Sequence, residues 1–452
     1  MPEPLNILLI HADQHRHDCL GISGHPLLRT PHLDRLAAEG VRFTQAVTPA
    51  PICSPARASL LTGVFPTRHG CLTIPWCCET FTSADPGLPT WTRLLADAGY
   101  DVRWVGKFHQ EVAGSPADHG VREFVSLREY RAYRQARGLP PPPQGWFGAI
   151  DRGVTVEHSS LAWQARQVVR MLHEQAAGGR PFVLRWDPPE PHLPNHVPED
   201  EAGLYPPETI PPWPSFPDPL HHKPPAQRRS RLRWGTEGMT WAQWQPVVSR
   251  YLATIDLLDR QVGRVLATLQ GLGLLDRTLV IYSADHGDFC GGHGMMDKHY
   301  AMYDDIVRVP LICRFPGVAP SVCHAPVIHA LDLATTIVTA AGLQPPPSFC
   351  GQDLRGLSRG EITPRDSAFV QYFGTQQGLY SSRALRTDRW KYVYNPAAFD
   401  ELYDLHADPG ELHNRADDPA CAAVLEACRE RMGRWMSEAG DPLSPPLWTW
   451  PH

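Results

Sequence analysis

The stretch NILLIHADQ, residues 6–14, decides the fold class. Its apolar part is too short to cross a membrane or to act as a signal peptide, and no basic segment precedes it. It therefore predicts a buried first β-strand, Asn6 to His11. Two polar residues, Asp13 and Gln14, follow almost at once. They are expected at one edge of a sheet, where the chain leaves the strand.

Short β-rich runs of this kind recur, and helical patterns follow them. The predicted strands are residues 6–11, 101–105, 182–186, 278–284 and 309–315. The predicted helices are residues 31–39, 89–98, 161–175, 241–269 and 331–341, several opened by proline or closed by glycine. This alternation predicts an α/β fold in which helices flank both faces of a large, mostly parallel sheet.

The pattern changes after about residue 365. Strand patterns at residues 368–373, 384–385, 391–394 and 401–405 precede a helical pattern at residues 422–436, and residues 386–389 look like a hairpin turn. We predict a main domain at residues 1–365, which carries the chemistry, and a small C-terminal α+β subdomain at residues 366–452. Within the main domain, the proline-dense residues 188–225 predict an irregular, partly rigid loop.

Composition excludes several classes of protein. Of the 452 residues, 42% are hydrophobic and 20% are charged, which is typical of a soluble globular protein. A net charge of -6 without a basic cluster argues against nucleic acid and membrane as partners. The 11 cysteines are odd in number and irregularly spaced, and they include the adjacent Cys77 and Cys78. No disulfide framework fits them, so a reducing, cytoplasmic location is predicted.

Two predicted strands end in residues with metal-binding chemistry. Asp13 and Gln14 follow the first, and Asp285 and His286 follow the strand at residues 278–284. The carboxyl ends of parallel strands meet at one edge of a sheet. Carboxylates with one imidazole suit a divalent cation, with Ca²⁺ as first choice and Mg²⁺ or Mn²⁺ as alternatives. Taken alone, Asp13 is equally well explained as a helix cap or a loop hydrogen-bonding group, and the metal-binding interpretation of Asp285 with His286 is only somewhat better supported.

The sequence CSPAR, residues 53–57, predicts a reactive cysteine at a helix N-terminus. Ser54 is expected to cap the helix, Pro55 to occupy its first position, and Gly63 to end it. Backbone N–H groups at such a position lower a thiol pKa or hold an anion. The plainer alternative is a buried structural cysteine beside a helix start.

Cys53 to Arg57 match the C-x-P-x-R pattern of sulfatases, in which the cysteine is converted to formylglycine. Ala56 stands where serine is usual. Further matches follow in the family's order: the first metal segment at residues 6–14, G-K-x-H at 106–109, P-H-x-P at 191–194, the second metal segment at 283–288, a lysine segment at 297–311, and the C-terminal subdomain at 400–409. The chain therefore resembles a sulfatase, and an alkaline-phosphatase-like fold is expected.

This resemblance implies a role for each matched residue. The metal ligands are Asp13, Gln14, Cys53, Asp285 and His286, and the positive groups around the sulfate are Arg57, Lys107, His109, His192 and Lys298. Hydrated formylglycine offers two hydroxyls on one carbon, one of which attacks sulfur while His192 or Lys298 protonates the leaving alcohol. The other hydroxyl then expels sulfate, and His109 takes its proton. The implied partners are a small-molecule sulfate ester and the formylglycine-generating enzyme.

Several alternatives stay open at this point. A phosphonate monoester hydrolase or phosphodiesterase can share this fold and the C-x-P-x-R cysteine, although Lys107 and His109 favour sulfate. A protein without activity that keeps the fold is a second rival. Gln14 is equally well explained as a turn residue, and Lys107 and Lys298 as solvated surface lysines. Four tryptophans are candidates either for stacking on a sugar or aryl group or for filling a core, namely Trp76, Trp146, Trp213 and Trp234.

Overall fold

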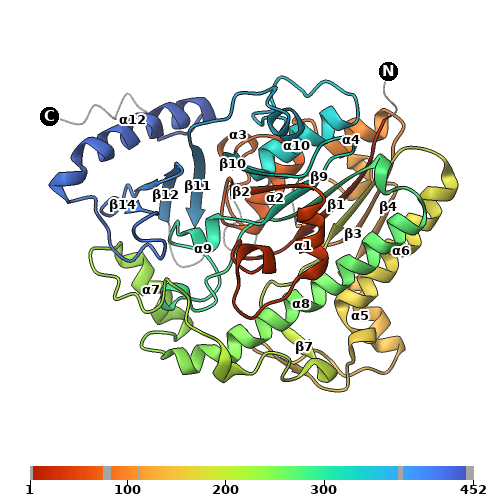
Figure 1. Ribbon diagram of the computed structural model, residues 1–452, viewed down its shortest axis with the longest axis horizontal. Helices are drawn as coiled ribbons and strands as arrows, with labels where there is room; N and C mark the ends of the chain where they lie inside the picture. Colours follow the sequence, from red (N-terminus) through yellow and green to blue (C-terminus); the bar gives the residue numbers. More distant parts are fainter. Residues whose placement is uncertain (1–3, 75–82, 110–111, 375–379, 444–452) are drawn as a thin grey trace.

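An eight-stranded sheet runs through the centre of the molecule (Figure 1). The computed structural model describes residues 4–74, 83–109, 112–374 and 380–443. The strand order is β10-β2-β9-β8-β1-β6-β3-β4. Neighbours pair in parallel, except that β9 is antiparallel to both β2 and β8. The predicted large, mostly parallel sheet is therefore confirmed.

The strands of this sheet are β1 Asn6–Ala12, β2 Val41–Val47, β3 Asp101–Gly106, β4 Glu123–Ser126, β6 Phe182–Asp187, β8 Thr278–Ala284, β9 Leu311–Arg314 and β10 Ser321–Ile328. All five predicted strands are present, but β2, β4 and β10 were not predicted. β4 is short and lies at one sheet edge, and β10 lies at the other edge with mostly accessible side chains. Such strands lack the continuous apolar run that marks a central strand.

The register of β1 against β8 brings the two predicted metal segments together. Pairing runs in parallel from Asn6 with Thr278 to Ala12 with Ala284. Asp13 and Asp285 directly follow the last residues of β1 and β8, so both lie at the carboxyl edge of the sheet. This edge is where open α/β sheets place their ligands.

Helices cover both faces of the sheet (Figure 1). On one face, α1 Pro31–Ala38 and α6 Ser160–Gly178 pack against the long helix α8 Trp241–Gly271. On the other, α2 Cys53–Thr62 and α4 Trp91–Asp97 pack against α10 His329–Ala340. Because both faces are covered, every residue of the central strands β1, β6 and β8 is buried. The helices that sequence predicted are confirmed, with ends shifted by up to three residues.

The C-terminal part forms a second, antiparallel sheet of order β11-β12-β13-β14, drawn in blue in Figure 1. Its elements are β11 Ala368–Gly374, β12 Tyr380–Arg386, β13 Trp390–Tyr394, β14 Glu401–Asp404 and the helix α12 Ala422–Ala439. The predicted hairpin turn is present, since the Thr387 N–H donates to the Trp390 carbonyl over 2.9 Å. This sheet shares a hydrophobic core with residues such as Phe65 and Phe289. The boundary between residues 365 and 366 stays a prediction.

The remaining segments are short. They comprise α3 Pro66–His69, α5 Leu127–Ala136, α7 Pro225–Trp234, α9 Asp304–Val307, α11 Leu354–Ser358 and the strand pair β5 Ala149–Asp151 with β7 His196–Pro198. The proline-dense residues 188–225 are irregular as predicted, with only β7 and 3-10 turns at Glu199–Glu201 and Pro207–Thr209 before α7 begins. Among the described helices, none is both long and apolar enough to cross a membrane.

Candidate active site

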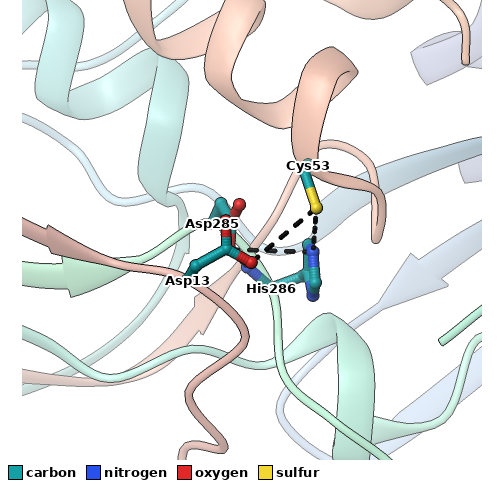
Figure 2. Close-up of side chains that lie close together, drawn as sticks. All are labelled: Asp13, Cys53, Asp285 and His286. Atoms are coloured by element: carbon teal, nitrogen blue, oxygen red, sulfur yellow. Dashed lines mark hydrogen bonds and ion pairs between the residues drawn. The ribbon is translucent and has the colours of Figure 1, made fainter. Parts of the chain in front are cut away.

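Four potential metal ligands meet at the carboxyl edge of the large sheet (Figure 2). Asp13 follows β1, Asp285 and His286 follow β8, and Cys53 is the first residue of α2. One ligand atom from each lies within 4.8 Å of the other three, and all four residues are buried. The structure therefore brings together side chains that are up to 273 residues apart in the chain.

His286 is oriented as a metal-binding imidazole is. Its Nδ1 lies 2.8 Å from the Gly287 carbonyl, so Nδ1 carries the proton and Nε2 faces the Cys53 Sγ at 3.2 Å. Burial alone would lower the pKa of His286, but the charges of Asp285 and Cys53 raise it to about 9. The cluster thus favours positive charge at its centre, and carboxylates with an imidazole suit a divalent cation there.

Arg57 joins the acids of this cluster. Its Nη2 donates to Asp13 Oδ2 over 2.9 Å and its Nε to Asp285 Oδ2 over 2.8 Å. Its Nη1 donates to Asp187 Oδ2 over 2.7 Å. Burial would lower the pKa of the fully buried guanidinium, but the three carboxylates raise it. Each of the three guanidinium nitrogens thus donates to a carboxylate, so Arg57 fixes the orientation of Asp13 and Asp285.

Asp187 is a site residue that sequence reasoning missed. It ends β6, which pairs in parallel with β1, so it reaches the same sheet edge as Asp13. Its carboxylate also accepts hydrogen bonds from Arg185 Nε and Nη2, each over 2.7 Å. Burial alone would raise the pKa of Asp187, but Arg185 and Arg57 lower it to about 2. The available signal was a third strand, FVLRWD, that ends in a carboxylate.

Helix α2 begins at Cys53 itself, so the predicted cap is wrong. Ile52 is the N-cap residue, and the Ser54 Oγ has no hydrogen-bond partner among the described residues. Ser54 instead occupies the second helical position, because the extended backbone of Ile52 already brings the chain into the helix. The predicted end at Gly63 is confirmed, and its φ of 68° is one that glycine adopts without strain.

The Cys53 thiol lies in a positive environment. Burial raises the pKa of Cys53, but the Lys107 and Lys298 charges, with His286 and a hydrogen bond from His109, hold it well below its ordinary value. An anion at this position is therefore stabilised.

Lys107 and Lys298 are not solvated surface lysines. The Lys107 Nζ lies 2.5 Å from Asp13 Oδ2. The buried Lys298 Nζ lies 3.0 Å from Gln14 Oε1, 3.1 Å from Asp297 Oδ1 and 2.9 Å from His192 Nε2. Because both lysines are held by acceptors at the site, their positive charges face the Cys53 thiol.

Gln14 is held in a dense hydrogen-bond network. Its Nε2 donates to Asp288 Oδ2 over 2.7 Å and to Asp297 Oδ1 over 3.0 Å, and its Oε1 accepts from Lys298. Burial and the charge of Asp297 raise the pKa of Asp288 to about 7. An amide oxygen has a second lone pair, so the Gln14 Oε1 keeps acceptor capacity beyond the Lys298 bond.

A cavity of about 1080 Å³ opens over the Cys53 thiol. Its lining contains the thiol with Lys107, His109, His192, Asp297, Lys298 and His299. Residues of β4 and α5 and two tryptophans, Trp146 and Trp234, complete the wall. One sequence candidate lies elsewhere, since Trp213 is buried against Arg16. Trp76, Cys77 and Cys78 lie outside the described residues.

The fold and site combine a carboxylate-rich cluster suited to a metal, a helix N-terminal cysteine and cations suited to a tetrahedral oxyanion, as in hydrolases of anionic esters. The family model described as Sulfatase matches residues 5–343, and that described as N-sulphoglucosamine sulphohydrolase, C-terminal, matches residues 291–438. The chain belongs to the sulfatase family.

Named relatives agree with this membership. The uncharacterized sulfatase YidJ of Escherichia coli (strain K12) is 30% identical over 98% of this chain and 89% of its own length. A choline-sulfatase of Rhizobium meliloti (strain 1021) is 28% identical over 96% of this chain and 88% of its own length. The chain is thus an enzyme that hydrolyses sulfate esters.

A solved structure with the same fold carries a different activity in its name. The phosphonate monoester hydrolase of Agrobacterium radiobacter superposes with a TM-score of 0.83, at 25% identity, over 97% of this chain and 96% of its own. Fold similarity alone therefore does not separate sulfate from phosphonate esters.

Proposed function

We propose that Cys53, once converted to formylglycine, is the nucleophile of sulfate ester hydrolysis. The position of the Cys53 Sγ carries this proposal: it lies 3.2 Å from His286 Nε2 and 3.7 Å from Asp13 Oδ1, beneath the cavity. In the structure the Cys53 Sγ stands in for the oxygens that hydrated formylglycine carries in the mature protein. Hydrated formylglycine carries two hydroxyls on one carbon. One attacks the sulfur, and the other loses its proton so that sulfate is expelled.

Calcium is the metal we propose, with magnesium or manganese as alternatives, because oxygen donors dominate the site. Asp13, Asp285 and His286 would hold it together with the oxygen at position 53, and the Gln14 Oε1 would complete the set. When bound, such a cation favours an ionised oxygen nucleophile and offsets the charge of the sulfate. Arg57 keeps the two aspartates in place through its bonds to Asp13 and Asp285.

Four side chains of the cavity bind the sulfate oxygens in this proposal: Lys107, His109, His192 and Lys298. A sulfate ester is an anionic tetrahedral group, so preorganised cations and N–H donors stabilise it as negative charge builds on the leaving oxygen. His109 also accepts the proton of the second hydroxyl when sulfate is expelled. The place of His109 in the cavity lining beside Cys53 supports this role, which the sulfatase resemblance implies.

The leaving alcohol requires a proton, and we assign it to His192. The His192 Nδ1 lies 2.5 Å from the Leu193 carbonyl, so Nδ1 carries a proton and fixes the ring. Its Nε2 faces the site and lies 2.9 Å from Lys298 Nζ, so without substrate it accepts a hydrogen bond from Lys298. His192 acts as the acid after it has taken up a second proton, which Nε2 then gives to the leaving oxygen. Burial lowers the pKa of Lys298, but the charge of Asp297 raises it more, so the net shift is upward. Lys298 therefore keeps its own proton and orients His192.

Maturation and location complete the proposal. The formylglycine-generating enzyme would act on Cys53 before or during folding, because Cys53 is buried in the folded chain. Every described cysteine is free and most are buried, which supports a reducing cytoplasm. Small imported sulfate esters would then be the substrates. Cell fractionation tests the location independently.

Mass spectrometry of the peptide that carries Cys53 tests the nucleophile. Protein produced with the formylglycine-generating enzyme is expected to carry an aldehyde at position 53, trapped by a hydrazide, and aryl sulfate turnover is expected to rise with the aldehyde fraction. Full turnover by protein whose Cys53 remains a thiol would overturn the proposal.

A further inference from the structure

Two arginines in the active-site cavity have no partner in the described part of the chain. Arg128 and Arg131 lie on α5 and both line the cavity over Cys53. Both side chains are exposed, and no described residue forms a hydrogen bond or ion pair with either of them. They are three residues apart on one helix, where like charges repel each other. An anion between them would remove this repulsion.

The carboxylates of the same cavity are already committed elsewhere. Glu129 Oε1 accepts the Ser126 N–H over 2.9 Å as part of the capping box of α5. Asp297 Oδ1 accepts from Gln14 and Lys298. The sulfate of a substrate is met by the cations beside Cys53, so the charges of Arg128 and Arg131 are in excess of what one sulfate requires.

The same cavity has an aromatic wall that is open to solvent. Trp146 is 60% exposed, and its ring lies 6.3 Å from that of Trp234 in an edge-to-face arrangement. Both rings line the cavity that contains Cys53. Because the two rings lie together on the cavity wall, they offer an apolar surface to a ligand, and an aromatic face of this kind packs against the C–H face of a sugar ring.

We propose that the substrate is a sulfated sugar that carries a second anionic group, a carboxylate or another sulfate. Arg128 and Arg131 bind that second group through charge-assisted hydrogen bonds, and Trp146 with Trp234 packs against the sugar ring. The proposal rests on the proposed function, because the first sulfate must reach the Cys53 side of the cavity.

Matched substrates test this proposal. The panel consists of methyl glucuronosides sulfated at one free hydroxyl each and the methyl ester of each, which keeps the sulfate and lacks the carboxylate charge. Mono- and disulfated methyl glucosides form a second arm. For at least one matched pair, kcat/KM is expected to be at least about tenfold higher for the substrate with the second anion. Arg128→Ala with Arg131→Ala is expected to remove this ratio, whereas Arg128→Lys with Arg131→Lys retains part of it.

Arg137→Ala is the control for loss of an arginine near the cavity. Arg137 is at the C-terminal end of α5, stacks on Tyr133 and is not part of the cavity lining. This variant is expected to leave the ratio intact. Equal kcat/KM for every matched pair, or a ratio that survives in the double alanine variant, would overturn the inference. An aryl sulfate assayed in parallel separates the two proposals, because its hydrolysis tests the proposed function alone.

Discussion

His192 Nε2 and Lys298 Nζ lie 2.9 Å apart, and each is also tied to a different part of the site. His192 is fixed by the Leu193 carbonyl, whereas Lys298 bonds to Gln14 and Asp297. Without substrate, the imidazole Nε2 accepts from Lys298. In the substrate complex we expect a protonated His192 whose Nε2–H donates to the leaving oxygen, while the released Lys298 N–H donates to a sulfate oxygen.

His192→Asn is expected to affect substrates according to their leaving group. A general acid contributes about a hundredfold or more when the departing alkoxide is strongly basic, and little when it is a nitrophenolate. The loss of kcat should therefore be much larger for a sugar sulfate than for 4-nitrophenyl sulfate. Lys298→Met is the comparison and should impair both substrates to a similar degree. Equal losses in His192→Asn would contradict its role as the acid.

Arg57→Met is expected to destabilise the fold strongly. The substitution leaves the buried Asp13, Asp187 and Asp285 without their shared cation. Removing one partner of a buried ion pair costs about 3–5 kcal/mol, which denaturant unfolding measures directly. Arg35→Ala is the control, because its pair with Glu39 is exposed and is worth at most about 1 kcal/mol. Similar losses in the two variants would show that Arg57 does not join the acids.

Chelation of the metal is expected to abolish turnover and lower the unfolding temperature together. Asp13, Asp285 and His286 converge in a buried position that exists only in the folded chain, so a cation bound there adds its binding free energy to the folded state. A ligand at a hundred times its Kd stabilises the folded state by about 2.7 kcal/mol. Calorimetry before and after chelation, with Ca²⁺, Mg²⁺ or Mn²⁺ restored singly, measures the effect. An unchanged unfolding temperature would exclude a bound metal at this cluster.

His69 is expected to make the fold sensitive to acid. Its Nδ1 accepts the Cys71 N–H over 3.1 Å and its Nε2 lies 3.0 Å from Ser59 Oγ, so the buried ring is neutral. Burial lowers the pKa of His69 to about 3, against 6.5 for an ordinary histidine. The unfolded chain therefore takes up the proton first, and stability present above pH ~6.5 is lost as the pH falls towards ~3.

Urea unfolding of wild type and His69→Gln measures this sensitivity. Between pH 7 and pH 5 the wild type should lose about 2 kcal/mol more than the variant, which has no titrating group there. Cys71 and Ser59 are outside the cavity lining, so the comparison does not depend on the metal site. Parallel pH curves for the two proteins would contradict a neutral buried His69.

Sequence predicted the features of the site that are local in the chain. Asp13 and Asp285 each end an apolar strand, and Cys53 begins a helix in a short motif, so a window of about ten residues contains the signal. Asp187 was missed although its strand also ends in a carboxylate, because nothing local indicates that Arg57 would bind it. The pairing depends on which strand lies next to β1.

Sequence could not predict which residues form the cavity wall, because this too depends on tertiary packing. Arg128 and Arg131 belong to a helix with a charged, weakly apolar sequence, and such a helix is usually a solvated surface. Trp146 was one of four tryptophan candidates, but no pattern in its loop separates it from a tryptophan that fills a core. Only tertiary packing brings them to the Cys53 side of the molecule. Sequence likewise placed the helix cap two residues too far along, at Ser54, because the backbone of Ile52 and not a side chain starts α2.

The assay that tests the central claim most directly compares three matched substrates: an aryl sulfate, an aryl phosphonate monoester and an aryl phosphodiester. The protein is produced with the formylglycine-generating enzyme, and Cys53→Ala is assayed beside it. We predict that sulfate hydrolysis dominates and disappears in Cys53→Ala. A preference for either phosphorus ester, or sulfate turnover that survives without Cys53, would contradict the assignment of this chain as a formylglycine-dependent sulfatase.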